Sequence, residues 1–364
     1  MTTRRDCLEF AWSAAASAAF SGSVRAAPRA LDLLVLGGTG FLGPHMVDYA
    51  LARGHRVTLF NRGVSAAGRY GARVEVLRGN RDARIEPGLS ALQGSRRWDV
   101  VIDNSGYLPR HVRDAATMLR GRCAQYVFVS TGAVYDFAGR EVCDESGPLV
   151  RLADPTSELE TAATYGPLKV ECERVLREAF GEARCTIVRP TYVFGPGDDT
   201  DRFTYWIERL ARGGEVLGPS FPELELQWVD ARDLCPWIVR LAESRTFGTF
   251  NAAGPRAPIS WRGVLEAVRS QLGSNATLRW ATPEVLQAVS LSLPLAAARR
   301  RRRRLNSDAA QRTGLEYLPL ADTVEATRAW WAGQDAARRA AVRDWPSAEL
   351  EARALAMLTG AAPA

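Results

Sequence analysis

A glycine-rich stretch near the start of the chain constrains the fold more than any other feature. Residues 33–36 read Leu-Leu-Val-Leu, which is typical of a buried strand, and residues 44–51 have the apolar spacing of a helix. Glycines that turn a strand into a helix present free N–H groups and the positive end of the helix dipole to a phosphate. An ordinary glycine-rich turn is the alternative. The stretch predicts a dinucleotide pyrophosphate site formed by Gly37, Gly38, Thr39, Gly40, Phe41, Leu42 and Gly43.

Further strand-like runs alternate with helical sequence through the first half of the chain. The runs are residues 56–60, 74–77, 99–103 and 125–131, and residues 110–119 form a helical segment before the last of them. Such alternation is typical of right-handed βαβ units and a parallel sheet. We therefore expect an α/β fold, a Rossmann-type doubly wound parallel sheet with a smaller, interleaved C-terminal substrate domain.

The 364 residues suit one dinucleotide-binding domain and a smaller interleaved one. We expect the dinucleotide-binding domain to span residues 28–195, with residues 222–254 returning to it. Residues 196–221 and 255–331 then form the substrate-binding region. Residues 332–364 are rich in alanine and arginine and predict a helical tail that Pro346 interrupts.

The first 27 residues have the pattern of an export signal rather than of a folded segment. Arg4 and Arg5 resemble a twin-arginine motif, an uncharged apolar run follows at residues 10–22, and residues 24–26 suit a cleavage site. This predicts export to the periplasm by the twin-arginine route, and the alternative is a basic tail on a cytoplasmic enzyme. The sequence has no run of 18 apolar residues, so we expect no integral membrane span.

The positive charge of the chain is a local feature. The six arginines at residues 299–304 account for the whole formal net charge of +6, so general affinity for nucleic acid is not indicated. The run could bind an anionic partner or form a solvated loop. With three histidines and an odd number of cysteines outside residues 1–27 that form no C-x-x-C pair, the sequence predicts no metal site.

The residues after the second strand bear on the choice of cofactor. A carboxylate there would bind the ribose 2′-hydroxyl of NAD, whereas an arginine suits the 2′-phosphate of NADP. The sequence has Asn61 and Arg62 at this place and no acid. The cofactor is therefore expected to be NAD or NADP, with a slight preference for NADP, and a solvated Arg62 is the alternative.

Polar residues also follow the third and fourth strands, at the edge of a parallel sheet where ligands bind. Residues 79–82, which end in Asp82, form a loop that could reach the adenine. Asn104, Ser105 and Gly106 come directly after the fourth strand. All four residues are candidate cofactor contacts.

A candidate catalytic group follows the fifth strand. Ser130 and Thr131 end that strand, and Tyr165 and Lys169 lie four residues apart, on one face of a helix. A phenol titrates near pH ~10, so a tyrosine that acts as a base near pH 7 needs about 4 kcal/mol of differential stabilisation. A neighbouring ammonium can supply part of it. In isolation, however, a Tyr-x-x-x-Lys pattern is a weak signal.

In combination with the glycine stretch, these motifs resemble the extended short-chain dehydrogenase/reductase family, the NAD-dependent epimerase/dehydratase group. Residues 188–197, 229–234, 250–254 and 314–331 add matching segments in the order of that family. The branch that it resembles includes isoflavone-reductase-like and chloroplast stem-loop-binding proteins. The resemblance implies that the three glycines bind the pyrophosphate, and it implies roles for four further residues. Thr131 would bind the substrate hydroxyl, Tyr165 would be the acid/base, Lys169 would hold the nicotinamide ribose, and Pro190 would open the loop beside the nicotinamide.

These features predict an NAD(P)-dependent oxidoreductase of the epimerase/dehydratase type, which acts on a secondary alcohol or carbonyl of a sugar-like or other small polar substrate. Residues 224–227 lack the arginine that family members specific for nucleotide sugars carry before the segment matching Trp228, which argues against a UDP-sugar. The sequence leaves a homodimer open. The rival hypothesis is a non-catalytic RNA- or anion-binding protein that uses residues 299–304.

Overall fold

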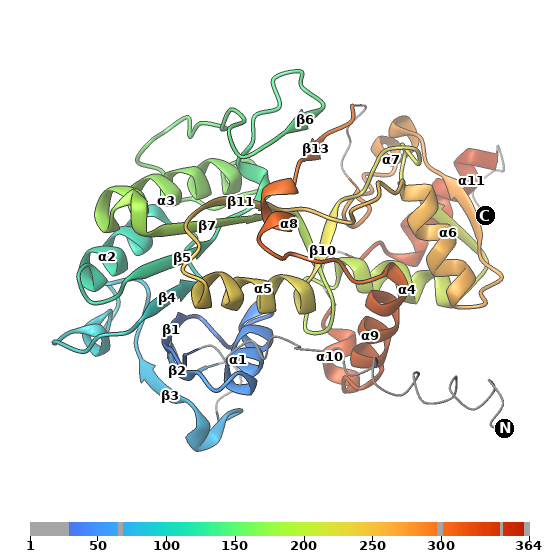
Figure 1. Ribbon diagram of the computed structural model, residues 1–364. Coiled ribbons are helices and arrows are strands. Elements are labelled where there is room, and N and C mark those ends of the chain that lie inside the picture. Colours follow the sequence, from blue (N-terminus) through green and yellow to red (C-terminus); the bar gives the residue numbers. More distant parts are fainter. Residues whose placement is uncertain (1–28, 65–67, 297–300, 343–344, 360–364) are drawn as a thin grey trace, which may run out of the picture.

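The computed structural model describes residues 29–64, 68–296, 301–342 and 345–359. A larger lobe carries a twisted sheet with helices on both faces, and a smaller lobe of helices and short strands lies beside it (Figure 1). The expected export signal at residues 1–27 lies outside the described residues, as do Arg299 and Arg300.

The large lobe is built on a seven-stranded parallel sheet. Its order is β11-β7-β5-β4-β1-β2-β3. The strands are β1 (Asp32–Leu36), β2 (Arg56–Asn61), β3 (Glu75–Arg78), β4 (Val100–Asp103), β5 (Gln125–Val129), β7 (Cys185–Pro190) and β11 (Gly248–Ala252). The direction of winding reverses between β1 and β4, and ligands of such sheets bind outside the carboxyl ends of the strands at that point. The expected fold class is confirmed.

Helices cover both faces of the sheet, which is why its inner strands consist mainly of buried apolar residues, whereas the edge strand β3 is charged and largely exposed. Leu33 and Val35 of β1 face α1 (Leu42–Ala52) and α5 (Ala231–Glu243). Leu34 and Leu36 face α2 (Pro109–Leu119) and α3 (Tyr165–Phe180) on the other side. The core therefore consists of two apolar layers that hold the carboxyl edge of the sheet in place.

The small lobe has its own apolar core, in which Trp206 is fully buried. Its helices are α4 (Arg202–Ala211), α6 (Trp261–Gln271), α7 (Pro283–Ala288), α9 (Leu320–Ala332) and α11 (Ala348–Thr359). Two parallel pairs of strands accompany them: β8 (Tyr192–Phe194) with β10 (Trp228–Asp230), and β9 (Glu215–Gly218) with β12 (Thr277–Trp280). Ser260 caps α6, because its Oγ accepts a hydrogen bond from the Gly263 N–H at 3.1 Å.

The remaining elements are short. They are the paired strands β6 (Val142–Cys143) and β13 (Arg304–Leu305), the helices α8 (Asp308–Arg312) and α10 (Ala336–Ala340), and the 3₁₀ helices η1 (Gly71–Arg73), η2 (Ser90–Leu92), η3 (Gly132–Val134) and η4 (Glu182–Arg184). In the described ranges, no helix combines the length and the apolar character that crossing a membrane requires.

The C-terminal segment is packed into the small lobe. The buried Glu351 of α11 accepts hydrogen bonds from Arg209 Nε at 2.7 Å and from the Leu217 N–H at 3.0 Å. Arg338 of α10 forms a bidentate ion pair with Asp201. Its two terminal guanidinium nitrogens donate to the two carboxylate oxygens of Asp201 at 2.6 and 2.8 Å. Both helices of the predicted tail therefore contact α4. α10 is bound at the N-terminus of α4 through Asp201, and α11 is bound at the side of α4 through Arg209.

Candidate active site

The glycine loop has the backbone geometry that its sequence predicts. Gly37 and Gly38 have φ angles of +110° and +83°, which side chains disfavour. A Cβ atom on Gly43 would lie 2.2 Å from the carbonyl carbon of Gly38, so α1 packs directly on the loop. A Cβ atom on Gly40 would meet no described atom within 4 Å. At Gly43 the backbone of Gly38 therefore leaves no room for a side chain, whereas at Gly40 there is free space beside the loop.

The N-terminus of α1 is free to bind an anion. Phe41 occupies the N-cap position without a side-chain cap, and the first turn carries no acid. The orphan N–H groups and the helix dipole there are unneutralised by the described side chains. Across the loop, His45 Nε2 lies 2.8 Å from the carbonyl oxygen of Pro196. The open glycine, the uncapped helix and the close packing at Gly43 all fit a dinucleotide pyrophosphate.

Asn104, Ser105 and Gly106 pack beside the glycine loop, as their position after β4 predicts. Ser105 Oγ donates to the carbonyl oxygen of Leu36 at 3.0 Å. The amide oxygen of Asn104 occupies the space that a side chain on Gly37 would need. These residues therefore form the wall of the loop on the β4 side.

Asp82 is engaged by protein groups in this structure. Arg110 donates to its two carboxylate oxygens at 2.6 and 3.0 Å, and the Arg84 N–H donates at 2.9 Å. The hydrogen bonds from Arg110 are the main reason why the pKa of Asp82 lies below its usual range. Arg110 also binds Glu158. A contact between Asp82 and adenine remains a prediction.

The two candidate cofactor residues at the end of β2, Asn61 and Arg62, have different surroundings. Asn61 Oδ1 accepts a hydrogen bond from the Gly63 N–H at 2.8 Å, which turns the chain after the strand. Arg62 is exposed, and among the described residues it forms no ion pair. Arg62 is therefore available to a ligand, whereas the side-chain oxygen of Asn61 is used locally.

Ser130 and Thr131 have different surroundings although they are adjacent. Ser130 Oγ donates to Glu173 Oε1 at 2.6 Å, and both residues are buried. Burial alone would raise the pKa of Glu173, but Arg189 binds both carboxylate oxygens and lowers it. Thr131 is half-buried, its Oγ1 accepts a hydrogen bond from the Ala133 N–H at 3.2 Å, and its hydroxyl also acts on the pKa of Tyr165. Of the two hydroxyls, that of Thr131 is the one that faces the tyrosine.

Tyr165 is the first residue of α3, which also explains why Pro167 is tolerated in the first turn. Burial raises the pKa of Tyr165, while the hydrogen bond from Thr131 and the charge of Arg202 act in the opposite direction. The phenol is therefore protonated near neutral pH in this state.

Lys169 lies one helical turn beyond Tyr165 and is buried. Its Nζ donates to the carbonyl oxygens of Gly106 at 2.9 Å and Val129 at 2.7 Å, at the ends of β4 and β5. Burial lowers its pKa. An ammonium has three N–H donors, so one remains for a ligand beside Tyr165.

Pro190 ends β7, where it pairs with Ala252. Its carbonyl oxygen lies 3.3 Å from the position of a Cβ atom on Gly132, directly after Thr131. Pro190 thus borders the loop that carries Thr131, as expected for a residue at the edge of the site.

Two residues near Tyr165 were not singled out as site residues by the sequence. Lys169 Nζ lies 5.4 Å from the ring centre of Tyr107, which is 45% exposed. Arg202, the first residue of α4, lies 5.4 Å over the ring of Tyr192 and acts on the pKa of Tyr165. Tyr107 directly follows the predicted cofactor contact Gly106, so its place in the sequence could have indicated a site residue. Arg202, by contrast, comes close to the site through the packing of the two lobes.

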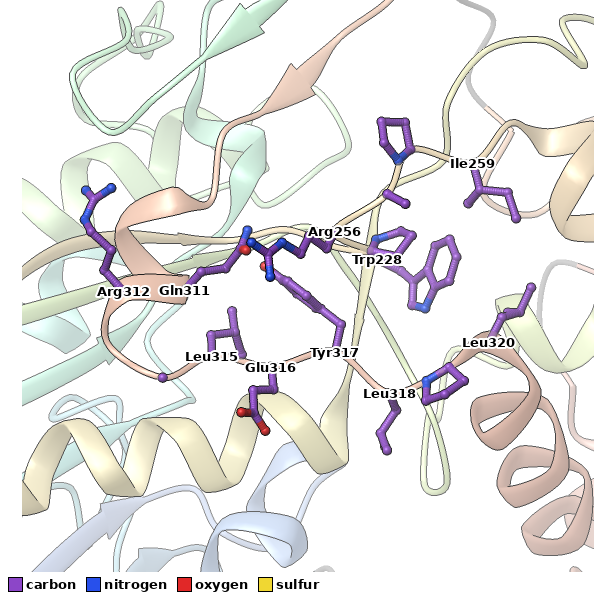
Figure 2. Close-up of a pocket in the computed structure, with 15 residues that line it drawn as sticks. Trp228, Arg256, Ile259, Gln311, Arg312, Leu315, Glu316, Tyr317, Leu318 and Leu320 are labelled. Carbon is purple, nitrogen blue, oxygen red and sulfur yellow. The ribbon is translucent and has the colours of Figure 1, made fainter.

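A cavity of about 850 Å³ lies elsewhere, between the segments 255–259 and 311–320 beside Trp228 (Figure 2). Tyr317 stands at its centre, and its hydroxyl donates to the carbonyl oxygen of Ala253 at 2.9 Å. None of the predicted site residues lines this cavity. It is therefore separate from the group around Tyr165.

Three of the four described arginines of the run, Arg302, Arg303 and Arg304, are engaged by the protein. Arg302 forms an ion pair with Glu225, Arg303 lies 5.3 Å over the ring of Phe137, and Arg304 belongs to β13. Arg304 therefore contributes to the short parallel pair of β6 and β13.

The seven-stranded parallel sheet, with the glycine loop after β1 and Tyr165 and Lys169 on α3, defines an α/β protein of the Rossmann type. The family model described as the NAD dependent epimerase/dehydratase family matches residues 33–86 and 93–253. The chain belongs to this family.

Two characterised relatives are similar in sequence. The chain is 26% identical to the chloroplast stem-loop binding protein of 41 kDa b of Arabidopsis thaliana over 65% of this chain and 61% of the relative. It therefore spans less than two thirds of that relative's length. It is 27% identical to the 2′-dehydrokanamycin reductase of Streptomyces kanamyceticus, over 72% of this chain and 74% of the reductase.

Solved structures share the fold. WbmG of Bordetella bronchiseptica, in complex with NAD and UDP, has a TM-score of 0.62 at 17% identity and is matched over 83% of this chain and 95% of its own. The UDP-glucose 4-epimerase of Thermotoga maritima, with UDP-glucose, also has a TM-score of 0.62 at 17% identity, over 82% and 98%.

Proposed function

We propose that this protein interconverts a secondary alcohol and a ketone on a small sugar-like substrate, with Tyr165 as the acid/base. The observation that carries the proposal is the meeting of Thr131, Tyr165 and Lys169 at the carboxyl edge of the sheet, beside the open glycine loop. The glycine loop is far from Thr131, Tyr165 and Lys169 in sequence, but all of them lie at the carboxyl edge of the parallel sheet.

The residues have separate roles in the proposed reaction. When bound, the nicotinamide supplies a hydride acceptor or donor. Tyr165 donates its phenolic proton to the carbonyl oxygen in the reductive direction and takes the hydroxyl proton in the oxidative direction. Thr131 orients the same oxygen, and Lys169 holds the ribose with its remaining N–H and stabilises the phenolate by its positive charge.

The substrate is proposed to lack a uridine diphosphate group. At the place where an arginine would bind the nucleotide, Gln227 exchanges two hydrogen bonds with the backbone of Leu305, at 2.7 and 3.0 Å. Glu225 is paired with Arg302. The relative that reduces a dehydro-aminoglycoside, by its name, supports a non-nucleotide ketone as the substrate class.

The test combines binding and turnover. The chain from residue 28 onward is purified and denatured, and released nucleotide is identified by mass spectrometry. Oxidation of NADPH and NADH is then followed with a panel of keto-sugars and UDP-keto-sugars. We expect Tyr165→Phe to abolish turnover on any active compound and to retain cofactor binding. Full activity of this variant would overturn the mechanism.

A second candidate function is RNA binding, which the similarity to a chloroplast stem-loop-binding protein favours. It would use the arginines of residues 299–304. Salt-dependent binding of a stem-loop RNA that is lost when these arginines are replaced would support it. Absence of binding at low salt would exclude it.

We also propose export by the twin-arginine route and leave a homodimer as a prediction. Arg4→Lys together with Arg5→Lys should retain the protein in the cytoplasm, as measured by cell fractionation. Equal amounts of both proteins in the periplasm would contradict this. Analytical ultracentrifugation determines the oligomeric state.

A further inference from the structure

Lys169 is the only lysine of the chain, although the sequence has 47 lysine and arginine residues in total. Its Nζ donates to the carbonyl oxygens of Gly106 and Val129, and it lies 4.3 Å from the ring centre of Phe128. A compact ammonium can reach two backbone carbonyls and offer its third N–H in another direction, whereas a guanidinium is larger and planar. The position of the Gly106 carbonyl therefore helps to set the direction of that third N–H.

The Gly106 carbonyl belongs to a closely packed turn after β4. A Cβ atom on Gly106 would lie 2.6 Å from Val112 Cγ2 and 2.7 Å from Phe128 Cε2, so the turn packs on α2 and β5. At the start of the turn, the Ser105 N–H donates to Asp103 Oδ1 at 3.1 Å. The carboxylate of Asp103 therefore helps to fix the path of the backbone that leads to Gly106.

Asp103, the last residue of β4, is itself held from two further segments. Its side chain is fully buried. Its Oδ2 accepts hydrogen bonds from Arg81 Nη2, in the loop after β3, and from the hydroxyl of Tyr126 on β5, each at 2.7 Å. With Ser105, three donors from three segments bind one carboxylate. Its orientation is therefore set by the packing of the sheet.

The charge of Asp103 also acts on the lysine. Burial lowers the pKa of Lys169, and four neighbouring groups act in the opposite direction. Those groups are Cys172 and Glu173 of α3, Asp103 of β4 and Glu160 of the segment before α3, and the phenols of Tyr107 and Tyr165 are also near. Burial raises the pKa of the Cys172 thiol to about 12, so this thiol is uncharged near neutral pH and three carboxylates remain.

Burial and partners distinguish Asp103 from the other two carboxylates. Glu160 is exposed, so solvent and salt screen its charge. Glu173 is buried, but Arg189 binds both of its oxygens. Arg81 reaches Asp103 through a single nitrogen. Asp103 is therefore the less neutralised of the two buried carboxylates near Lys169.

We propose that Asp103 is a positioning residue for Lys169: its carboxylate fixes the turn that places the Gly106 carbonyl on the ammonium, and its charge favours the charged form of the lysine. The inference rests on the proposed function, in which Lys169 holds the cofactor ribose and stabilises the phenolate of Tyr165. Asp103 acts through Lys169 and contacts neither cofactor nor substrate in this scheme.

The test measures the titration of Lys169 directly. Because the chain has one lysine, protein labelled with ¹³C at the lysine Cε gives a single lysine signal, and its shift with pH reports this one pKa. We expect Asp103→Asn to move the titration midpoint down by about one pH unit, since a buried carboxylate that favours the ammonium is lost. The affinity for NADH or NADPH, measured by calorimetry, should then decline with rising pH at a correspondingly lower pH.

Tyr126→Phe is the matched control. It removes another hydrogen bond to the same carboxylate, but it keeps the charge of Asp103 and the contact from the Ser105 N–H. We expect the titration of Lys169 in this variant to match the wild type. An equal shift in Tyr126→Phe and Asp103→Asn would trace the effect to disturbed packing and would overturn the proposal.

A second variant covers the case in which Asp103→Asn does not fold because the buried Arg81 loses its partner. Asp103→Asn combined with Arg81→Met removes both charges, and it should still lower the titration midpoint, although by less. A folded Asp103 variant in which Lys169 titrates as in the wild type would overturn the proposal. Failure of the wild type to bind either dinucleotide would instead overturn the proposed function, while the titration still decides the role of Asp103.

Discussion

Ser130 Oγ donates a hydrogen bond to Glu173 Oε1 over 2.6 Å in the interior of the large lobe. Glu173 in turn binds Arg189, so the serine belongs to a buried charged network beneath the site. Its neighbour Thr131 faces Tyr165 instead. The two hydroxyls that the sequence offers as alternatives therefore separate into a structural one and one that faces the site.

This separation predicts opposite effects of two substitutions. Ser130→Ala should lower the free energy of unfolding by about 1–3 kcal/mol, because Glu173 loses a buried hydrogen bond, and should leave kcat nearly unchanged. Thr131→Val should lower kcat and cost about 1 kcal/mol of stability at most, because Thr131 Oγ1 also accepts a hydrogen bond from the Ala133 N–H at 3.2 Å. Urea denaturation and steady-state kinetics measure the two quantities. Loss of kcat in Ser130→Ala with unchanged stability would contradict the assignment.

The geometry of the glycine loop predicts different effects for a second pair of substitutions. A methyl group on Gly43 would collide with the backbone of Gly38, whereas one on Gly40 meets open space. Gly43→Ala should therefore destabilise the protein by about 1–3 kcal/mol through overpacking. Gly40→Ala should fold normally and weaken dinucleotide binding by about tenfold or more, since the pyrophosphate needs that space. Calorimetric binding and thermal unfolding distinguish them; tight binding by Gly40→Ala would place the cofactor elsewhere.

Asp233 of α5 predicts a pH dependence of stability. Burial raises its pKa to about 6, although the Leu318 N–H donates to its carboxylate at 2.8 Å. The native state therefore binds more protons than the unfolded state between the ordinary carboxyl pKa and pH 6, and this group's contribution to stability falls as the pH rises through that window. Allowing for partial exposure, the loss is about 1–2 kcal/mol.

Asp233→Asn removes this titration and keeps an oxygen for the Leu318 N–H. We expect the variant to be more stable than the wild type at pH 8 and to show a flatter stability profile between pH values of about 4 and 7. Unfolding free energies across the pH range test this. Parallel profiles for the two proteins would mean that Asp233 does not titrate in this window.

Glu351 tests whether the C-terminal helix supports the small lobe. Glu351→Ala removes the carboxylate that pairs with the half-buried Arg209 and leaves the buried Leu217 N–H without its acceptor, at an expected cost of about 1–3 kcal/mol, while Arg209 keeps its hydrogen bonds to the carbonyl oxygens of Gly213 and Glu215. Glu349→Ala, on the exposed side of α11, is the control and should cost little. Thermal unfolding measures both, and equal midpoints for the two variants would show that α11 is dispensable.

Local sequence was sufficient for the features that local physics determines. The glycine spacing, the apolar strands covered on both faces and the four-residue separation of Tyr165 and Lys169 predicted the sheet and the shared helix face. Each of these predictions depends on backbone geometry or periodicity within a short segment, and the observed architecture agrees with each.

Long-range packing determined what the sequence could not predict. The partner of Ser130 lies 43 residues away on α3, and Arg78 reaches the end of β2 only through the register of β3. Likewise, the carboxylate of Asp201 is paired with Arg338, which lies 137 residues further along the chain. Spacing along the chain carries no information about such pairs.

The ion pair between Asp201 and Arg338 also bears on how the protein is made. The two residues are 137 positions apart, and Trp345 adds a hydrogen bond to the same aspartate backbone at 3.1 Å. During synthesis, α4 leaves the ribosome before these partners exist. The contacts that hold the start of that helix, which carries Arg202 toward Tyr165, can therefore form only after residues 338–345 have been added to the chain.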